Sequence, residues 1–240
     1  MRKFIFGLLT GGLLIGCGKE EAKPTSGLTI SGTIKGFKKG TLYIQRIKND
    51  SVLVPIDTLK FNGQSDFKTH IDLKHPEMLY LFIDRGVSNS LDNNLPFFAE
   101  PGVMTIESSL EYFTADAKIT GSKNQALYDE YKLMMSRLID KNLDLIQLRI
   151  LAMNEKNQAR VDSIQAEQDD NLKRRYLMTT NFAVNHGDYE IAPYVTLAEI
   201  PDVSLKYLDT IQKSMKPKIA QSLYGKKLTT YTKERKKLGQ

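Results

Sequence analysis

The strongest constraint on the fold is a change of hydrophobic period at Gly121. Before it, from Leu28 onward, short runs alternate apolar and polar residues and are separated by Gly, Pro and Asn, which is typical of strands and turns. After it, apolar residues recur every three or four positions over long stretches, which is typical of amphipathic helices. We therefore expect an α+β chain with strands over residues 28–121 and helices over residues 122–240.

Eight short runs in the first part are predicted to be strands, because they alternate or are rich in β-branched and aromatic residues. Two turn sequences between them, Asn62-Gly63 and Pro101-Gly102, have the composition of β-hairpin turns. Short strands at this spacing predict an antiparallel β-sandwich or an open barrel. The expected strands are residues 28–34, 42–44, 52–61, 65–73, 78–84, 95–99, 103–108 and 117–120.

The second part begins with the residues of a helix N-terminus. Ser122 can accept a hydrogen bond from the Gln125 amide while the Gln125 side chain reaches back, an arrangement called a capping box. Two long helices are expected, from Ser122 to about Asn154 and from Gln158 to Asn185. We expect an antiparallel hairpin; a single bent helix is the alternative, since the connection lacks Gly and Pro. Their apolar stripes are Leu127, Tyr131, Met134, Leu138, Leu145 and Leu148, and Val161, Ile164, Leu172, Tyr176 and Ala183.

Shorter helices are expected after Gly187, which closes the second long helix. The last segment, from Gly225 to Gln240, contains six basic residues and one acidic residue. We expect it to form an amphipathic helix that packs on the domain and exposes its cations to water or to anionic lipid headgroups. The shorter helices cover about residues 192–199, 204–214 and 217–224, and the apolar residues of the last segment are Tyr224, Leu228, Tyr231 and Leu238.

The first residues predict export and attachment to lipid. Arg2 and Lys3 precede an uncharged run from Phe4 to Gly16, which is the pattern of a signal peptide and is too short to span a bilayer permanently. The Leu-Ile-Gly-Cys sequence that ends this region resembles the lipobox of bacterial lipoproteins. That resemblance implies removal of residues 1–16 and lipidation of Cys17, which is the only cysteine in the chain.

The residues after Cys17 bear on the location of the protein. Residues 17–27 are polar and include Pro24, as in a flexible linker. Within them, the Gly-Lys-Glu-Glu sequence resembles the export signal of surface lipoproteins in Bacteroidetes. We expect a chain anchored to the outer membrane that is either exposed at the cell surface or faces the periplasm. The expected division is a signal peptide (1–16), a lipidated linker (17–27), a β-sandwich-like domain (28–121) and a helical region with a basic tail (122–240).

The net charge of +6 does not indicate a nucleic-acid partner. Arg2 and Lys3 leave with the signal peptide, and the remaining excess of positive charge is confined to residues 225–240. A lipid-anchored envelope protein also seldom meets nucleic acid, so we expect no such partner. With Cys17 lipidated, no disulfide can form within the mature chain.

Four sequence segments together resemble one family of bacterial lipoproteins. The family is the domain of unknown function that precedes the thioredoxin-like domain in thiol–disulfide oxidoreductase lipoproteins of Bacteroidetes, and the resemblance covers essentially the whole mature chain. The thioredoxin-like domain is expected to be missing here, because no Cys-x-x-Cys is present, so the redox chemistry of the family transfers to no residue. The segments are Ile-Ser-Gly-Thr-Ile at 30–34, Ile-Asp-Thr-Leu at 56–59 before Gly63 and Phe67, Phe-Ala-Glu-Pro-Gly at 98–102 and Ile-Thr-Gly-Ser at 119–122.

The sequence contains no recognisable catalytic or metal-binding set. The histidines lack the spacing of a zinc site, and no nucleophile elbow or phosphate-binding loop occurs. We therefore expect no catalytic residue, no cofactor and no metal. Three Asp-Ser/Thr-aliphatic triplets are similar to the O-glycosylation pattern of Bacteroidetes envelope proteins. The three histidines are His70, His75 and His186, and the possible glycosylated residues are Thr58, Ser163 and Thr210.

Three functions are left open by the sequence. The first is a non-enzymatic envelope lipoprotein that binds a partner protein or a glycan. The second is an accessory component of a redox system that works with a separate thioredoxin-like partner. The third is a hydrolase or sugar-binding protein with a site assembled from scattered strand residues. Because the chain has no tryptophan, stacking on a glycan would depend on Tyr43, Tyr80, Tyr112 and Phe113.

Overall fold

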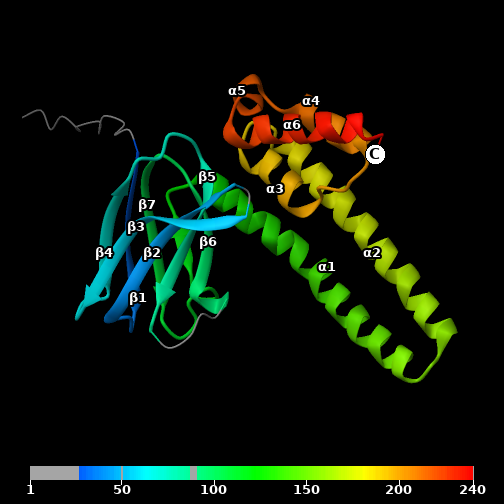
Figure 1. Ribbon diagram of the computed structural model, residues 1–240, viewed down its shortest axis with the longest axis horizontal. Coiled ribbons are helices and arrows are strands. Elements are labelled where there is room, and N and C mark those ends of the chain that lie inside the picture. The colour runs from blue at the N-terminus through cyan, green and yellow to red at the C-terminus, as the bar shows by residue number, and fades with distance from the viewer. Residues whose placement is uncertain (1–26, 50, 87–90, 240) are drawn as a thin grey trace, which may run out of the picture.

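The computed structural model describes residues 27–49, 51–86 and 91–239 (Figure 1). Strands occupy the chain up to Thr120 and helices follow from Lys123, so the α+β class and the order of strands before helices are confirmed. In Figure 1 the strands form two layers, and two long helices extend diagonally away from them. The signal peptide and Cys17 lie outside the described residues.

All eight expected strands are present. They are β1 (Leu28–Lys35), β2 (Lys39–Lys48), β3 (Val52–Asn62), β4 (Asp66–Ile71), β5 (Glu77–Asp84), β6 (Asn94–Ala99), β7 (Gly102–Ser109) and β8 (Lys118–Thr120), with a 3-10 helix η1 (Leu91–Asn93) before β6. They form two sheets, ordered β4-β1-β7-β8 and β3-β2-β5-β6. Side chains from both sheets, among them Ile30, Leu81 and Phe97, form one buried core between the layers. The β part is therefore a sandwich and not an open barrel.

Two expectations about strand pairing are wrong. Asn62-Gly63 and Pro101-Gly102 do turn the chain, with Gly63 at a φ of 101° and Gly102 at 131°. However, these turns join β3 to β4 and β6 to β7, which belong to different sheets, so they are links between layers and not hairpins. The sandwich is also not purely antiparallel, because β1 pairs with β7 in parallel. Turn composition shows that the chain reverses, whereas packing of the two layers decides which strands then pair.

The two long helices form the expected antiparallel hairpin, and the single bent helix is wrong. They are α1 (Lys123–Asn154) and α2 (Gln158–Asn185), and Figure 1 shows them side by side. Lys156 adopts a left-handed conformation between them, with a φ of 53°. That conformation usually calls for Gly or Asn, which explains why composition did not reveal the turn. The Asn157 side chain then caps α2 by accepting a hydrogen bond from the Arg160 amide at 3.1 Å.

The start of α1 is only partly the expected capping box. The Ser122 hydroxyl accepts from the Gln125 amide at 2.9 Å, as predicted. The Gln125 side chain does not reach back to Ser122. Its carbonyl oxygen accepts from the Phe98 amide in β6 at 2.6 Å, and its amide nitrogen donates to Asp129 at 2.9 Å. A side chain that could have completed a local cap therefore ties the helix to the sandwich.

Asn124 is a second polar link at the same place. The Glu100 carboxylate, which follows β6, accepts from the backbone amides of Lys123 and Asn124 at 3.0 and 2.9 Å. The Asn124 side chain donates to Glu100 and, at 3.1 Å, to Glu190, and it accepts from the Ile191 amide at 2.7 Å. Because Asn124 is almost fully buried, these bonds connect the sandwich, α1 and the start of α3 (Ile191–Glu199) through direct contacts.

The remaining helices pack around the sandwich end of the hairpin (Figure 1). They are α3 (Ile191–Glu199), α4 (Leu205–Ser214), α5 (Pro217–Ala220) and α6 (Leu223–Lys237). The helix expected at 217–224 ends early, because Ser222 starts a new helix by accepting from the Gly225 amide. Gly187 follows α2 as expected, and a Cβ there would lie 2.3 Å from the Ser214 carbonyl oxygen. Within the described segments, no helix is both long and apolar enough to cross a membrane.

Three apolar residues expected on buried stripes lie on the surface instead. Leu148 and Leu172 are 39% and 40% exposed, and Leu238 at the end of α6 is 70% exposed. In the outer half of the hairpin, the contact between α1 and α2 is narrower than the predicted stripes, with Leu145, Ala152 and Ile164 as its buried apolar residues. Helical spacing therefore identified the correct helices but assigned too many residues to the contact.

Candidate functional site

A cavity of about 970 Å³ opens where the helices meet the second sheet. Its sheet side comes from β2 and β5, and its helical side comes from α3 and α6. This size is at the upper end of the range for small-ligand sites. We call it the junction groove and define it by Arg46, Glu77 and Tyr80 on the sheet side and Tyr194, Tyr224 and Lys226 on the helical side.

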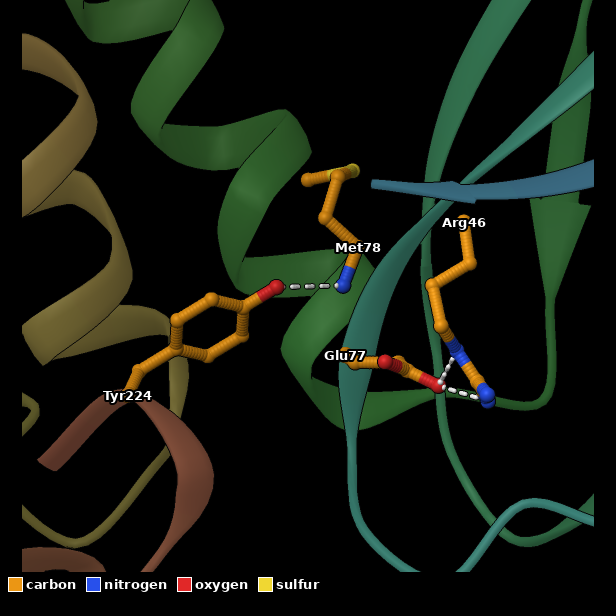
Figure 2. A network of polar contacts seen from close by, with 4 residues as sticks. All are labelled: Arg46, Glu77, Met78 and Tyr224. Carbon is orange, nitrogen blue, oxygen red and sulfur yellow. Dashed lines mark hydrogen bonds and ion pairs between the residues drawn. The ribbon is translucent and has the colours of Figure 1, made fainter. Parts of the chain in front are cut away.

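An ion pair between Arg46 and Glu77 lies on the sheet side of the groove (Figure 2). The Arg46 Nε donates to Glu77 Oε1 at 2.9 Å, and an Nη donates to the same oxygen. Burial raises the pKa of the Glu77 carboxyl, and the Arg46 guanidinium opposes that increase. These bonds use two of the five N–H donors of Arg46, and its side chain is 37% exposed, so the guanidinium can also donate to a ligand.

A hydrogen bond joins the two walls of the groove. The Met78 amide in β5 donates to the Tyr224 hydroxyl of α6 at 2.9 Å, as Figure 2 shows. Burial raises the pKa of Tyr224, so its phenol stays protonated at neutral pH. This bond fixes the separation of the sheet and α6 beside the Arg46–Glu77 pair, so the groove is built into the fold and does not depend on a flexible loop.

Aromatic rings pack against one another behind the groove. The Tyr194 ring meets the rings of Phe98, Tyr128 and Tyr224 edge-on, with centroids 5.4, 6.0 and 5.1 Å apart. Burial raises the pKa of Tyr128 to about 12 and also raises the pKa of Tyr80 above its ordinary value. Because these rings already contact each other, less of their surface is free for stacking against a ligand.

The rim of the groove is more basic than acidic. Lys226 and Lys227 project from exposed positions of α6, and His75 lies exposed before β5, whereas Glu234 contributes one acidic group. Lys227 also interacts electrostatically with Glu77. The wall between these charges is apolar and includes Ile47, Leu197 and Leu223. The groove thus combines apolar surface, tyrosine hydroxyl groups and a cationic edge.

The residues singled out from the sequence as modification sites lie elsewhere. Cys17 is outside the described residues. Thr58 on β3, Ser163 on α2 and Thr210 on α4 are all exposed, and none of them lines the groove. O-glycosylation at these positions stays a prediction.

The three histidines are far apart in the fold. His70 lies on β4, where it bonds to Thr29, and only His75 is at the groove. The His186 ring lies 2.8 Å from the Phe182 carbonyl oxygen at the end of α2, which fits the expected capping role. Among the described residues, no group of three or more His, Cys, Asp and Glu side chains is placed to hold a metal ion.

The aromatic residues considered for glycan stacking are also dispersed. Tyr80 lines the groove, Tyr43 packs on Phe82 with ring centroids 6.1 Å apart, and Phe113 is buried in the sandwich core. Tyr112 is 57% exposed but lies in a turn after β7. The groove itself was not predicted from the sequence, because its lining is drawn from positions 46 to 234. The available signal was that Tyr194 and Tyr224 are tyrosines within two of the short helices expected from the sequence, at residues 192–199 and 217–224.

The comparison with known families identifies one part of the chain. Residues 28–128 match the model of a family described as a domain of unknown function, DUF4369. The match covers the sandwich and the first residues of α1, whereas the resemblance from the sequence motifs was expected over the whole mature chain. Only the sheet side of the junction groove falls within the matched residues. No curated protein matches the chain.

Proposed function

We propose that this chain, whose residues 28–128 are a DUF4369 domain, is a non-enzymatic envelope lipoprotein that binds a partner protein in the junction groove. The observation that carries the proposal is the groove itself, a built cavity between two parts of the fold with apolar walls and a cationic rim. Interfaces between proteins combine apolar area, tyrosine and arginine in the same way.

The chemistry of the groove favours a peptide segment over a glycan. A sugar ring binds best to an exposed aromatic face, whereas the Tyr194 and Tyr224 rings are packed against each other and against Phe98. A segment with apolar and acidic residues would place the former on Leu197 and Leu223 and the latter near Lys226. The Tyr80 and Tyr194 hydroxyl groups and the free N–H groups of Arg46 supply donors for its backbone carbonyls.

The N-terminal sequence is the basis for including a lipid anchor in the proposal. Cys17 is the sole cysteine and follows a short uncharged run, and two or more acyl chains on it would give stable anchoring. We propose the outer membrane as the location, with the protein exposed at the cell surface or facing the periplasm. A Cys17→Ala variant should leave the membrane fraction, and protease treatment of intact cells should distinguish the two faces.

Crosslinking and pull-down from the native envelope tests the groove. Ala198→Trp places a large ring at an exposed position of α3 that lines the groove, and Lys226→Glu reverses a rim charge. Each variant should reduce the captured partner roughly tenfold, since about 1.4 kcal/mol of lost binding has that effect. Ala159→Trp on α2 and Lys233→Glu on α6 make the same changes at exposed positions that do not line the groove, and they should capture as much as the wild type.

The same experiment distinguishes the alternative function. An accessory role in a thiol–disulfide system, suggested by the family resemblance, requires that the captured partner carry a thioredoxin-like domain. A partner without thiols, lost from both groove variants and kept by both controls, supports the binding module alone. Equal capture by all four variants would contradict a role for the groove in either function.

A further inference from the structure

The outer half of α1 carries a stripe of apolar side chains that nothing in the described structure covers. Five residues contribute, and each is between 40% and 57% exposed. They follow one another at intervals of four, three, four and three residues along the helix. We call them the outer stripe: Ile139, Leu143, Ile146, Ile150 and Met153.

This spacing is the heptad repeat with which helices pack against other helices. The same helix already uses such a line on the side that faces α2, where Leu138, Leu145 and Ala152 lie seven residues apart. The outer stripe is shifted from that line by one residue, which is about 100° around the helix. A helix with two apolar lines at this angle has the pattern of a bundle helix with two neighbours, and α1 has one neighbour here.

The outer stripe is complementary to itself in length and spacing. The exposed apolar residues of α2, Leu172 and Leu177, lie five positions apart and form no line. A two-fold axis across α1 would place each outer stripe against an identical one of the same length and spacing. The flanking positions carry few charges, with Asp140 and Gln147 on one side and Asn142 and Arg149 on the other, so no block of like charges opposes the contact.

We propose that a second copy of this chain packs its outer stripe on this one, so that two hairpins form four helices with the two α1 helices in the middle. Five half-exposed side chains of this size offer on the order of 500 Å² per copy, which is comparable to the largest apolar patch on a typical monomer, and such patches are often interaction sites. Two copies then bury about 1,000 Å², and the flanking side chains add to it, which is near the lower limit for a specific interface. The dimer is therefore expected at micromolar and not nanomolar concentration.

Sedimentation velocity of the full chain in a mild non-ionic detergent tests the proposal. The wild type should shift from monomer to dimer between about 1 and 100 µM, the range expected for a small interface. A Leu143→Glu/Ile150→Glu variant should raise the dissociation constant at least about 100-fold, because it would bury carboxylates against apolar partners. Both residues are more than half exposed in one copy, so circular dichroism should show unchanged helix content.

A matched control separates the stripe from general surface polarity. Leu148→Glu/Leu151→Glu adds the same charges to α1 at 39% and 53% exposed positions on another side of the helix. This variant should dimerise like the wild type. A wild type that stays monomeric at 100 µM would overturn the proposal. A control variant that dimerises as weakly as the stripe variant would also overturn it. So would a photocrosslinker in place of Ile146 that joins a different protein, and not a second copy, in the native envelope.

Discussion

The two ends of the α1–α2 hairpin are stabilised in different ways. At the sandwich end, α1 and α2 share a buried cluster with Phe98 of β6 and Val195 of α3, and the Tyr131 and Thr179 hydroxyl groups are 2.8 Å apart inside it. At the outer end the buried apolar side chains are Leu145, Ala152 and Ile164. The two helices are continuous from end to end, but their buried contacts fall into two separate clusters.

The difference shows which apolar residues serve the fold. Near the sandwich, large apolar side chains of the hairpin such as Leu127 and Phe182 are buried. Toward the turn, most are exposed, although the helices there are as regular as elsewhere. The exposed residues lie outside the buried contact between α1 and α2, which is formed there by Leu145, Ala152 and Ile164. That is why the outer stripe indicates an interaction surface.

Truncation of core residues at the two ends should give the largest contrast. Phe98→Ala removes a fully buried ring that contacts Tyr194 and Tyr224, and it should lower the free energy of unfolding by about 3–5 kcal/mol. Leu145→Ala, in the thin outer contact, should cost about 2 kcal/mol. Urea denaturation followed by circular dichroism measures both. Equal losses would mean that the outer contact is as well packed as the junction.

Buried asparagines offer a second contrast. Asn124→Ala breaks side-chain bonds to Glu100, Glu190 and the Ile191 amide, and should cost about 1–3 kcal/mol because buried polar groups lose their partners. Asn171, farther along the hairpin, donates one bond to the Leu138 carbonyl, and its Oδ1 has no partner. Asn171→Ala should cost less than about 1 kcal/mol. Thermal unfolding ranks the two variants, and the reverse order would show that Asn124 is not a link in the junction.

The helix caps give a smaller contrast. Ser122→Ala removes the cap of α1 at a buried position, and Asn157→Ala removes the cap of α2 at an exposed one. We expect losses of about 1–2 kcal/mol for Ser122 and about 0.5 kcal/mol for Asn157, since water can replace an exposed cap. Hydrogen exchange at Gln125 and Arg160 should report the two losses locally. A larger effect at Asn157 would contradict the view that the sandwich end holds the hairpin.

The smallest expected effect concerns pH. Burial raises the pKa of Glu77 above its ordinary value of 4.5, so folding favours protonation of this carboxyl relative to the unfolded chain. Its contribution to stability is present below pH 4.5 and is lost as pH rises through the raised pKa. Relative to wild type, Glu77→Gln should therefore become more stable as pH increases from about 4 to 7. If the wild type instead became more stable relative to the variant over this pH range, the attraction between Arg46 and the ionised Glu77 carboxylate would outweigh the effect of burial.

Glu155→Gln is the control from the outer end of the hairpin. It breaks the Arg160–Glu155 pair, whose side chains are 45% and 56% exposed. Exposed pairs contribute little, so this variant should differ from wild type by less than about 0.5 kcal/mol over the same pH range. A pH-dependent difference as large as that of Glu77→Gln would show that the measurement does not isolate the buried pair.

Local sequence patterns predicted the elements well where local physics decides them. The helix from Gln158 to Asn185 has the expected bounds, and the Ser122 cap is present. The errors occur where tertiary contacts compete. Gln125 has the residue type of a capping box, but its side-chain oxygen accepts a hydrogen bond from the Phe98 amide in β6 and does not reach back to Ser122. The parallel pairing of β1 with β7 depends on how the two layers pack, which no short segment encodes.

The candidate site was the least predictable part. The junction groove exists because β5 and α6 meet, and Met78 and Tyr224 are far apart in the chain. No spacing rule connects such residues. The outer stripe is different, because its intervals of four and three are visible in the sequence between Ile139 and Met153. The pairing of α1 with α2 explains one apolar stripe on each helix, and α1 carries a second stripe that this pairing does not explain.

The parallel pairing of β1 has a consequence for the order of folding. Leu28 lies opposite Ile71 on one side and Gly102 on the other, so the first strand needs partners that come much later in the chain. Closing such long loops slows folding, whereas α1 and α2 are neighbours in sequence and can pair quickly. As the polypeptide emerges from its N-terminus, one edge of β1 stays open until β7 appears. During folding of the full-length chain, the sandwich is thus the slow part of the molecule, and the hairpin can form before the surface on which it rests is complete.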